Sequence, residues 1–228
     1  MDPTETRMKL VLAAEQLFAE KGIDTVSLRE INRAAGQKNT AALHYHFGTR
    51  DALMEAIFEH RMAGINDRRV AMLDALEAAG PVTDIRPVVA AMVIPLAEQL
   101  EPARQGGNYV RFLAQALSDP SIDLGGLVRD KFDHGMARTR DLMRGLLADL
   151  PPEVVEQRIR HAVAHFVHAL ADKARRDANG SSTRWPKSSA TGGALFVANL
   201  VDTISGALTA SVSDETLALV TEATRKTA

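Results

Sequence analysis

Apolar side chains recur at intervals of three and four residues along most of this chain of 228 residues. That interval places them on one face of an α-helix, whereas a half-buried strand alternates apolar and polar residues. Between residues 6 and 20, for example, Leu10, Ala14 and Leu17 fall on a common face. Alternation of the strand type never persists long enough to indicate a strand. The sequence therefore predicts an all-α protein.

Residues that start or stop helices divide this pattern into segments. Ser27-Leu28-Arg29-Glu30 has the form of a capping box, in which the serine hydroxyl accepts a hydrogen bond from the backbone three residues later. Gly22 and Gly80-Pro81 are expected to end helices, and Pro95 to kink one. A flexible connection is predicted from Asn179 to Ser189. The predicted helices span approximately residues 6–20, 27–36, 39–47, 50–79, 84–101, 108–117, 124–150, 153–178, 190–210 and 214–225.

Composition narrows the class of protein. The chain has no cysteine, which excludes a disulfide framework and a thiolate metal site. Its first residues lack the basic start and apolar run of a signal peptide, and no apolar stretch approaches the roughly 20 residues that span a membrane. We therefore expect a cytoplasmic protein with no membrane partner. The net charge of −2 argues against binding nucleic acid through overall charge, but it permits a local basic face.

The three predicted helices at the N-terminus fit a helix-turn-helix module. In such a module the second helix of the pair enters the DNA major groove and presents its first residues to the bases. Here that helix begins with Lys38, Asn39, Thr40 and Ala41. The small Ala41 allows the backbone to approach closely, while Lys38 and Asn39 are able to hold phosphates or read bases. This segment is therefore predicted to read DNA.

A basic bias accompanies the predicted reading helix. Between residues 25 and 50 there is one acidic residue, Glu30, and the segment has a formal charge of +3. The four basic residues are Arg29, Arg33, Lys38 and Arg50. His44, Tyr45 and His46 suit phosphate contacts near the end of the helix, and Arg50 suits the flanking DNA backbone. The alternative is that each is an ordinary surface residue of a small helical bundle.

From Arg7 to Leu53 the order of residues resembles the tetracycline repressor (TetR) family of transcription regulators. The matching positions are Arg7, Ala13-Ala14, Leu17-Phe18, Gly22, Val26-Ser27, Ile31, Ala34-Ala35-Gly36, Leu43, Tyr45-His46-Phe47, Arg50 and Leu53. Asn32 departs from the usual alanine, His44 from a frequent tyrosine, and Gln37 to Ala42 is one residue longer than the common form. These departures resemble a sub-branch with the form Ala-Gly-Gln-x-Asn-x-x-Ala-Leu-x-Tyr-His-Phe-Gly.

The resemblance implies a DNA-binding domain over residues 1–50 and an effector-binding and dimerisation domain over residues 51–228. It implies that Ser27 caps a helix at the DNA and that the tyrosine and histidine side chains touch phosphate. The expected protein is a homodimeric repressor that a small, largely apolar effector releases from operator DNA. A ligand-independent or activating regulator of the same family is the alternative.

An enzyme is the competing interpretation from another class. His161, His165 and His168 share one face of a predicted helix and fit the spacing of metal ligands. However, they lie opposite the apolar face, so a solvated or subunit-facing stripe is favoured over a metal site. The sequence has no glycine-rich phosphate loop and no Gly-x-Ser-x-Gly nucleophile motif. We therefore predict no enzymatic activity, no cofactor and no metal.

Two further surfaces are predicted in the larger domain. Methionine and aromatic side chains of the middle helices are expected to line an adaptable effector pocket: Met62, Met92, Phe112, Met136 and Met143. The helix over residues 190–210 carries a wide apolar arc and small residues that permit close packing. The resemblance implies a four-helix dimer interface there, with packing inside one chain as the alternative. The expected interface residues are Phe196, Leu200, Ile204, Gly206 and Leu208.

Overall fold

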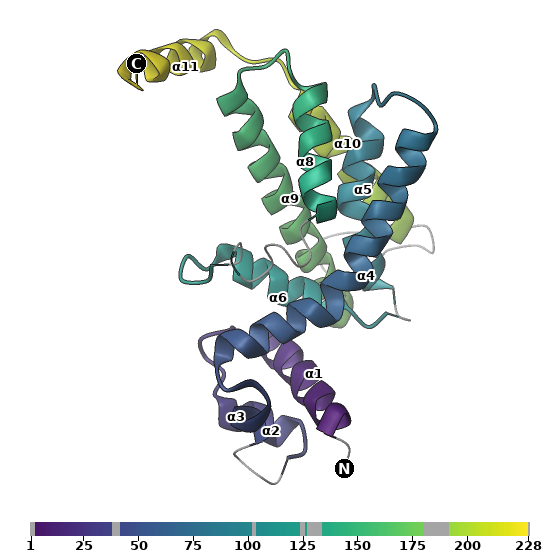
Figure 1. Cartoon of the computed structure of the whole chain (residues 1–228), viewed down its shortest axis with the longest axis vertical. Helices are drawn as coiled ribbons and strands as arrows, with labels where there is room; N and C mark the ends of the chain where they lie inside the picture. Colours follow the sequence, from purple (N-terminus) through teal and green to yellow (C-terminus); the bar gives the residue numbers. More distant parts are fainter. Residues whose placement is uncertain are drawn as a thin grey trace.

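A computed structural model describes residues 3–37, 42–101, 104–123, 126, 134–179 and 192–227. Within these ranges every regular element is a helix, which confirms the all-α prediction. Figure 1 shows a small group of helices at one end of the long axis, which we call the head. The head consists of α1 (Pro3–Lys21), α2 (Leu28–Ala34) and α3 (Ala42–Phe47).

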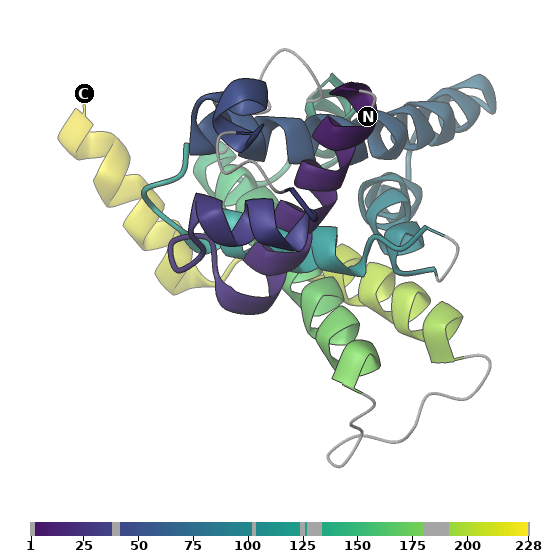
Figure 2. The same ribbon diagram turned by 90° about the horizontal axis from the view of Figure 1, so that it is seen from below.

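The remaining helices form the body. They are α4 (Arg50–Ala78), α5 (Ile85–Ala97) with a 3-10 turn at Glu98–Leu100, α6 (Gly107–Ser118), α8 (His134–Leu146), α9 (Pro152–Asn179), α10 (Gly192–Thr209) and α11 (Asp214–Thr227). In Figure 1, α6 crosses between the head and an upright bundle of α5, α8, α9 and α10. α11 extends away from that bundle in both Figure 1 and Figure 2.

The predicted helix boundaries agree with the structure to within a few residues at most positions. Within the helix predicted over residues 124–150, α8 spans His134–Leu146. Most of residues 124–133 lie outside the described part of the chain, as does most of the predicted connection from Asn179 to Ser189. Pro95 lies inside α5, which continues past it to Ala97 before tightening into the 3-10 turn.

Local sequence signals set the shape of the head. Ser27 caps α2, because its side-chain oxygen accepts a hydrogen bond of 3.2 Å from the backbone nitrogen of Glu30, as the capping-box pattern predicts. Gly22 ends α1 with a φ of +102°, a conformation that side chains on Cβ disfavour. The chain can therefore turn sharply between α1 and α2.

α4 connects the head to the body. Its first turns bury Leu53, Ile57 and Phe58, and its later turns bury Ile65 and Leu73. The ring of Phe58 packs against Phe112 of α6. Most buried apolar residues of both parts belong to a single cluster, so no gap in the core separates head from body. The predicted division at residue 50 falls on the first residue of α4.

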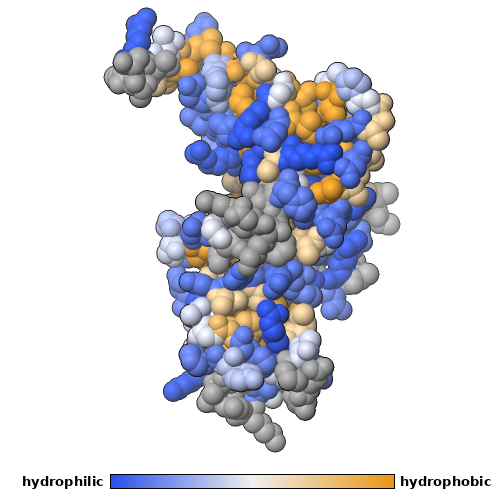
Figure 3. Space-filling model, viewed as in Figure 1, coloured by the Kyte–Doolittle hydropathy of each residue, from blue (hydrophilic) through white to orange (hydrophobic). Residues whose placement is uncertain are grey.

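α10 is, among the described residues, the one helix long and apolar enough by composition to cross a membrane, contrary to our reading of the sequence. The structure uses its apolar side for packing, since Leu200, Val201 and Ile204 are buried against neighbouring helices. Its exposed side carries polar groups, including Asp202, which accepts a hydrogen bond of 2.7 Å from Arg86. Figure 3 shows hydrophilic residues over most of the visible face, with apolar residues in separate patches.

Candidate nucleic-acid interface

α2 and α3 are held together by a buried asparagine that the sequence interpretation had noted only as a departure. Asn32 is 2% exposed, and its Oδ1 accepts a hydrogen bond of 3.2 Å from the backbone nitrogen of Leu43 in α3. Its Nδ2 donates to the carbonyl of Leu28, also at 3.2 Å. Leu43 itself is fully buried. Asn32 therefore satisfies a backbone donor at the start of the short α3 and fixes that helix against α2.

The outer side of the α2–α3 pair carries several of the predicted DNA contacts. Tyr45 is 83% exposed, and its ring meets that of His46 edge to face, with centroids 5.1 Å apart. His44 is exposed and its Nδ1 lies 3.1 Å from the carbonyl oxygen of Gly48. Ser27 is exposed at the first turn of α2 while it caps that helix. Lys38, Asn39, Thr40 and Ala41 lie outside the described residues.

The sequence pattern places Arg50 at the DNA backbone, and in the structure it also has contacts inside the head. Its guanidinium points into the head, where it donates to the carbonyl oxygen of Ile23 and, at 2.6 Å, to that of Val26. The same group lies 5.7 Å from the ring centroid of Phe18. These donors tie α4 to the α1–α2 connection, and the phosphate contact expected of Arg50 stays a prediction.

The charge of this surface is set by how its single acid is paired. Lys21 donates a hydrogen bond to the carboxylate of Glu30, and this bond lowers the pKa of Glu30 below its usual value, with a further contribution from the backbone N–H of Ser27. Arg29 and Arg33 are exposed. Their charges thus remain on a surface whose acid is already neutralised, which suits contact with phosphate.

A buried ion pair joins the head to the body. Glu15 on α1 is 2% exposed, and both of its carboxylate oxygens accept hydrogen bonds of 2.9 Å from Arg61 on α4. Arg61 also donates to the carbonyl oxygen of Arg104, just before α6. Arg111 on α6 donates, at 2.9 Å, to the carbonyl oxygen of Ala19 in α1. A movement of α4 or α6 would therefore be transmitted to α1 in the head through these hydrogen bonds.

The predicted dimer residues on α10 divide into two groups. Leu200, Ile204 and Leu208 are no more than 5% exposed and pack inside the chain. Gly206 is exposed, with nothing within 4 Å of a Cβ added to it. Phe196 is half-buried, with the ammonium nitrogen of Lys173 5.7 Å from its ring centroid. Packing inside one chain, the alternative interpretation of the apolar arc, thus accounts for Leu200, Ile204 and Leu208.

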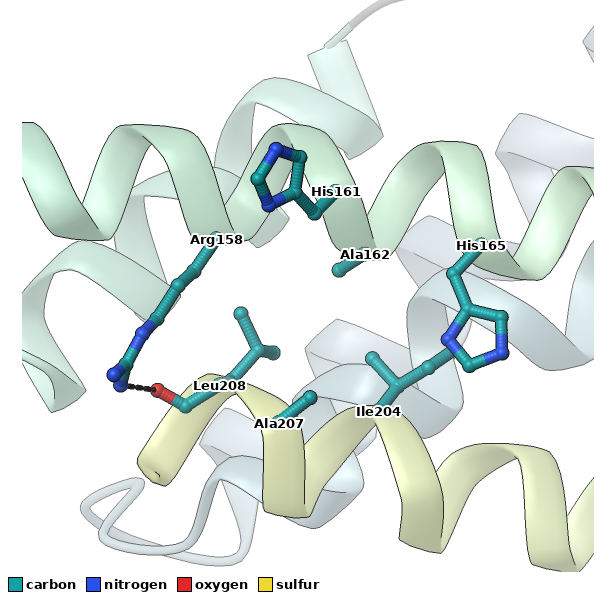
Figure 4. A pocket seen from close by; sticks show the side chains of 7 residues that line it. All are labelled: Arg158, His161, Ala162, His165, Ile204, Ala207 and Leu208. Carbon is teal, nitrogen blue, oxygen red and sulfur yellow. Dashed lines mark hydrogen bonds between the residues drawn. The ribbon is translucent and has the colours of Figure 1, made fainter. Parts of the chain in front are cut away.

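The three histidines of α9 are all exposed, as expected, but they do not share one environment. His161 and His165 line a hollow of about 170 Å³ between α9 and α10, whose floor includes Ala162 and Ile204 (Figure 4). His168 instead lies with its Nε2 3.3 Å from the hydroxyl of Ser118 on α6. Among the described residues no group of three histidine or acidic side chains is placed to hold a metal ion.

The five residues predicted to line an effector pocket lie on α4, α5, α6 and α8. Three of them, Met92, Phe112 and Met143, are fully buried in the common core, and Met62 and Met136 are half-buried against it. None of the five lines the hollow between α9 and α10, or a larger one of about 340 Å³. That larger hollow lies between the head and the segment after α6, and it is lined by Ile23, Asp24, Arg50, Asp51, Met54, Ser121, Ile122, Asp123 and Gly126.

Comparisons with known proteins agree with this arrangement. Residues 10–57 match the model of bacterial regulatory proteins of the tetR family, and residues 90–207 match the tetracyclin repressor-like C-terminal domain. A comparison with curated protein sequences finds no match.

Two solved structures share the fold. A protein assigned to the tetR family of transcription regulators, from Shewanella sp. PV-4, is 16% identical with a TM-score of 0.56, covering 87% of this chain and 97% of its own. The fatty acid degradation regulator FadR from Bacillus halodurans is 13% identical with a TM-score of 0.52, covering 90% of this chain and 95% of its own. At these identities the likeness concerns the fold alone.

Proposed function

Because the chain belongs to the tetR family of bacterial regulatory proteins, whose N-terminal and C-terminal models both match it, we propose that it is a homodimeric repressor released from operator DNA by a small effector. The observation that carries the proposal is the outer surface of the head. There Tyr45 on α3 and the arginines Arg29 and Arg33 on α2 are exposed, and a hydrogen bond to Asn32 joins the two helices. The proposed site of action is the bacterial cytoplasm.

In the proposed complex each subunit places the segment from Lys38 to Phe47 in one DNA major groove. Two such segments must lie about one DNA turn apart, roughly 34 Å, to meet the half-sites of a near-palindromic operator. Tyr45, His44 and His46 contact phosphates, and Asn39 reads a base. The proposal includes a DNA-binding domain over residues 1–50 and an effector-binding and dimerisation domain over residues 51–228. It also includes the finer assignment to the sub-branch with the Ala-Gly-Gln-x-Asn form.

The second subunit is proposed to cover the exposed side of α9 and α10. This surface includes the hollow between α9 and α10, which His161 and His165 line, and it includes Gly206. The open surroundings of Gly206 permit a close helix crossing. An effector in the body would favour a dimer with the wrong distance between its two heads. Moving such an equilibrium from 1:99 to 99:1 requires about 5.5 kcal/mol of differential binding. α4, which packs in both parts, would transmit the change.

Operator binding is tested by selecting DNA from a random pool and measuring affinity by fluorescence anisotropy over a range of salt concentrations. We expect affinity to fall steeply with salt. Tyr45→Phe should weaken binding roughly two- to tenfold for every sequence, the factor expected for one hydrogen bond. Arg225→Ala, an exposed change on α11 in the body, serves as the control and should leave affinity unchanged. Failure to select any sequence would overturn the proposal.

Dimerisation is tested by Gly206→Trp. Because nothing in the chain surrounds this position, the substitution should leave the protomer folded and obstruct only a partner that packs closely there. Sedimentation should show a shift from dimer to monomer at micromolar concentration. An unchanged dimer would place the interface on another surface.

A further inference from the structure

α11 differs from the other described helices of the body, because none of them packs along it. Figures 1 and 2 show it extending away from the bundle, at the end of the body far from the head. Its sequence nevertheless favours a helix, since Ser213 Oγ accepts a hydrogen bond of 3.3 Å from the backbone nitrogen of Thr216 and two acids occupy the first turn. A helix of 14 residues is only marginally stable by itself in water, so we expect one of its sides to be covered.

One side of α11 is apolar and lies at the surface. Leu217, Leu219 and Val220 fall within a wide arc of the helix, given a turn of about 100° per residue. Leu217 is 40% and Leu219 60% exposed, and both are among the few large apolar residues that the described chain leaves in solvent. Arg225 lies on the opposite side of the helix. The apolar side is therefore the one that a partner would cover.

The start of α11 is held in a direction that leads away from its own body. Arg158 on α9 donates hydrogen bonds to the carbonyl oxygens of Leu208, at 2.8 Å, and of Ala210, at 2.6 Å. Figure 4 shows the first of these bonds. Together they fix the end of α10 and the residues that lead to α11. Leu217 and Leu219 thus need another molecule to cover them.

The hollow of about 170 Å³ between α9 and α10 has a character that matches α11. It lies beside the start of α11, because Arg158 and Leu208 both line it. Its floor is apolar and its rim carries basic side chains (Figure 4). The floor consists of Ala162, Ile204, Ala207 and Leu208, and the rim of Arg158, His161 and His165. The apolar side of α11 fits such a floor, and Asp214 and Glu215 in its first turn carry the charge opposite to the rim.

A second copy of the chain would bring these two surfaces together. Two heads that bind one operator must face the same DNA, so the twofold axis of the dimer runs from the heads to the far end of the bodies. Each α11 then lies at the same height as the hollow of the partner subunit, because both are at the end of the body far from the head. In such a symmetric interface the contact occurs twice.

We propose that α11 is an arm exchanged between two subunits, and that its apolar side docks in the hollow between α9 and α10 of the other copy. The inference rests on the proposed homodimer, and it adds the segment that closes the interface. The matched family model of the C-terminal domain ends at residue 207, before α11 begins, so the family match does not include this contact.

Cross-linking tests the contact directly, because the chain has no cysteine of its own. Chains with Leu217→Cys or Leu219→Cys are co-expressed with differently tagged chains that carry His161→Cys on the rim of the hollow, and a short bismaleimide is added. We expect cross-linked heterodimers. Leu12→Cys replaces a leucine of the head that is 42% exposed, and it should give none.

The double variant Leu219→Cys/His161→Cys separates exchange from packing inside one chain. Co-expression with an excess of the cysteine-free chain should abolish its cross-link, because most double-variant subunits then have a partner without cysteine. A cross-link that persists in one chain would mean that α11 folds back on its own body, and the proposal would be wrong. Absence of any cross-link from α11 would refute it as well.

Sedimentation provides a second measurement. Leu217→Asp/Leu219→Asp should raise the dimer Kd about tenfold or more, because an apolar contact does not accommodate unpaired carboxylates. Both leucines are exposed in the protomer, so circular dichroism should show an unchanged fold. Arg225→Ala, on the opposite side of the same helix, is the control and should leave the dimer intact. An unchanged Kd in the double variant would overturn the inference alone, whereas a monomeric wild type would refute the proposed homodimer itself.

Discussion

Asn32 in the head and Tyr109 in the body are both buried polar side chains, but their surroundings differ. Asn32 donates to the carbonyl of Leu28 and accepts from the backbone of Leu43, so its amide joins two helices. The hydroxyl of Tyr109 has no such partner among the described residues. The difference indicates that the amide of Asn32 fixes one arrangement of the head, whereas the hydroxyl of Tyr109 ties no described helices of the body together.

The largest effect is expected where these two regions are joined. Arg61→Met leaves the carboxylate of Glu15, which is 2% exposed, buried without its bidentate partner. Removing one member of a buried ion pair typically costs about 3–5 kcal/mol. Urea unfolding at neutral pH should show a loss of that size, together with weaker operator binding because α1 is no longer fixed to α4.

Arg68→Met is the matched control for this change. Arg68 forms a 3.0 Å ion pair with Glu98, but its side chain is 50% exposed. Exposed pairs contribute about 0–1 kcal/mol, so the control should unfold close to the wild type. Equal losses in the two variants would show that head and body are not joined through Glu15.

A smaller effect is expected within the head. Asn32→Ala introduces the residue usual in similar sequences and leaves the backbone nitrogen of Leu43 without this acceptor. A buried donor left unsatisfied costs about 1–3 kcal/mol. We expect a loss of stability in that range and a reduced operator affinity, because α3 is only six residues long and loses its anchor on α2. Unfolding and anisotropy measurements on the same preparation would show whether both changes occur together.

The contrast between Asn32 and Tyr109 also marks how far the sequence could predict this molecule. Helix positions and the Ser27 cap follow from periodicity and local capping, which depend on neighbouring residues alone. Asn32 appeared only as a departure from a family pattern, since its partner Leu43 is eleven residues away. Contacts between residues so far apart in the sequence depend on how helices pack against one another. The spacing of apolar residues along one helix carries no information on that packing.

The same reason explains the sites that differ from expectation. Arg50 was placed on DNA because of its charge and position, but its donors turn inward to carbonyl groups more than twenty residues away. On α10 the apolar arc was visible in the sequence, but periodicity alone could not decide whether a partner subunit or α5 and α9 cover it. The ion pair of Glu15 and Arg61 combines two distant segments and gave no local signal.

Tyr109→Phe should change stability in the opposite direction to Asn32→Ala. The substitution keeps the ring in its cluster with Phe58 and Phe112 and removes a hydroxyl that has no partner in the described chain. Because this relieves the cost of burying an unsatisfied group, we expect equal or greater stability, by up to about 1 kcal/mol. Urea unfolding without any ligand measures the effect. A loss as large as that of Asn32→Ala would mean that the hydroxyl is a structural group, and the comparison between head and body would fail.

The smallest effect concerns acid sensitivity. The hydrogen bond from Lys21 lowers the pKa of Glu30 in the head below its usual value near 4.5. In the body, the hydrogen bond from Arg138 lowers the pKa of Glu77 in the same direction. A carboxylate whose pKa is lowered by folding stabilises the protein above its unfolded pKa, and the contribution disappears as pH falls through the folded pKa. Glu30→Gln should therefore unfold more easily than the wild type at neutral pH, and the difference should disappear as the pH falls through the lowered pKa of Glu30. Glu77 is exposed and Glu30 is only half-buried, so the differences should be small, and hydrogen exchange is the suitable measurement. Glu30→Gln should speed exchange in α2 at neutral pH, whereas Glu77→Gln should act on the end of α4 and leave α2 unchanged. If both variants speed exchange in head and body alike, the two regions respond to acid as one unit, and their separate pairing of charges has no local consequence.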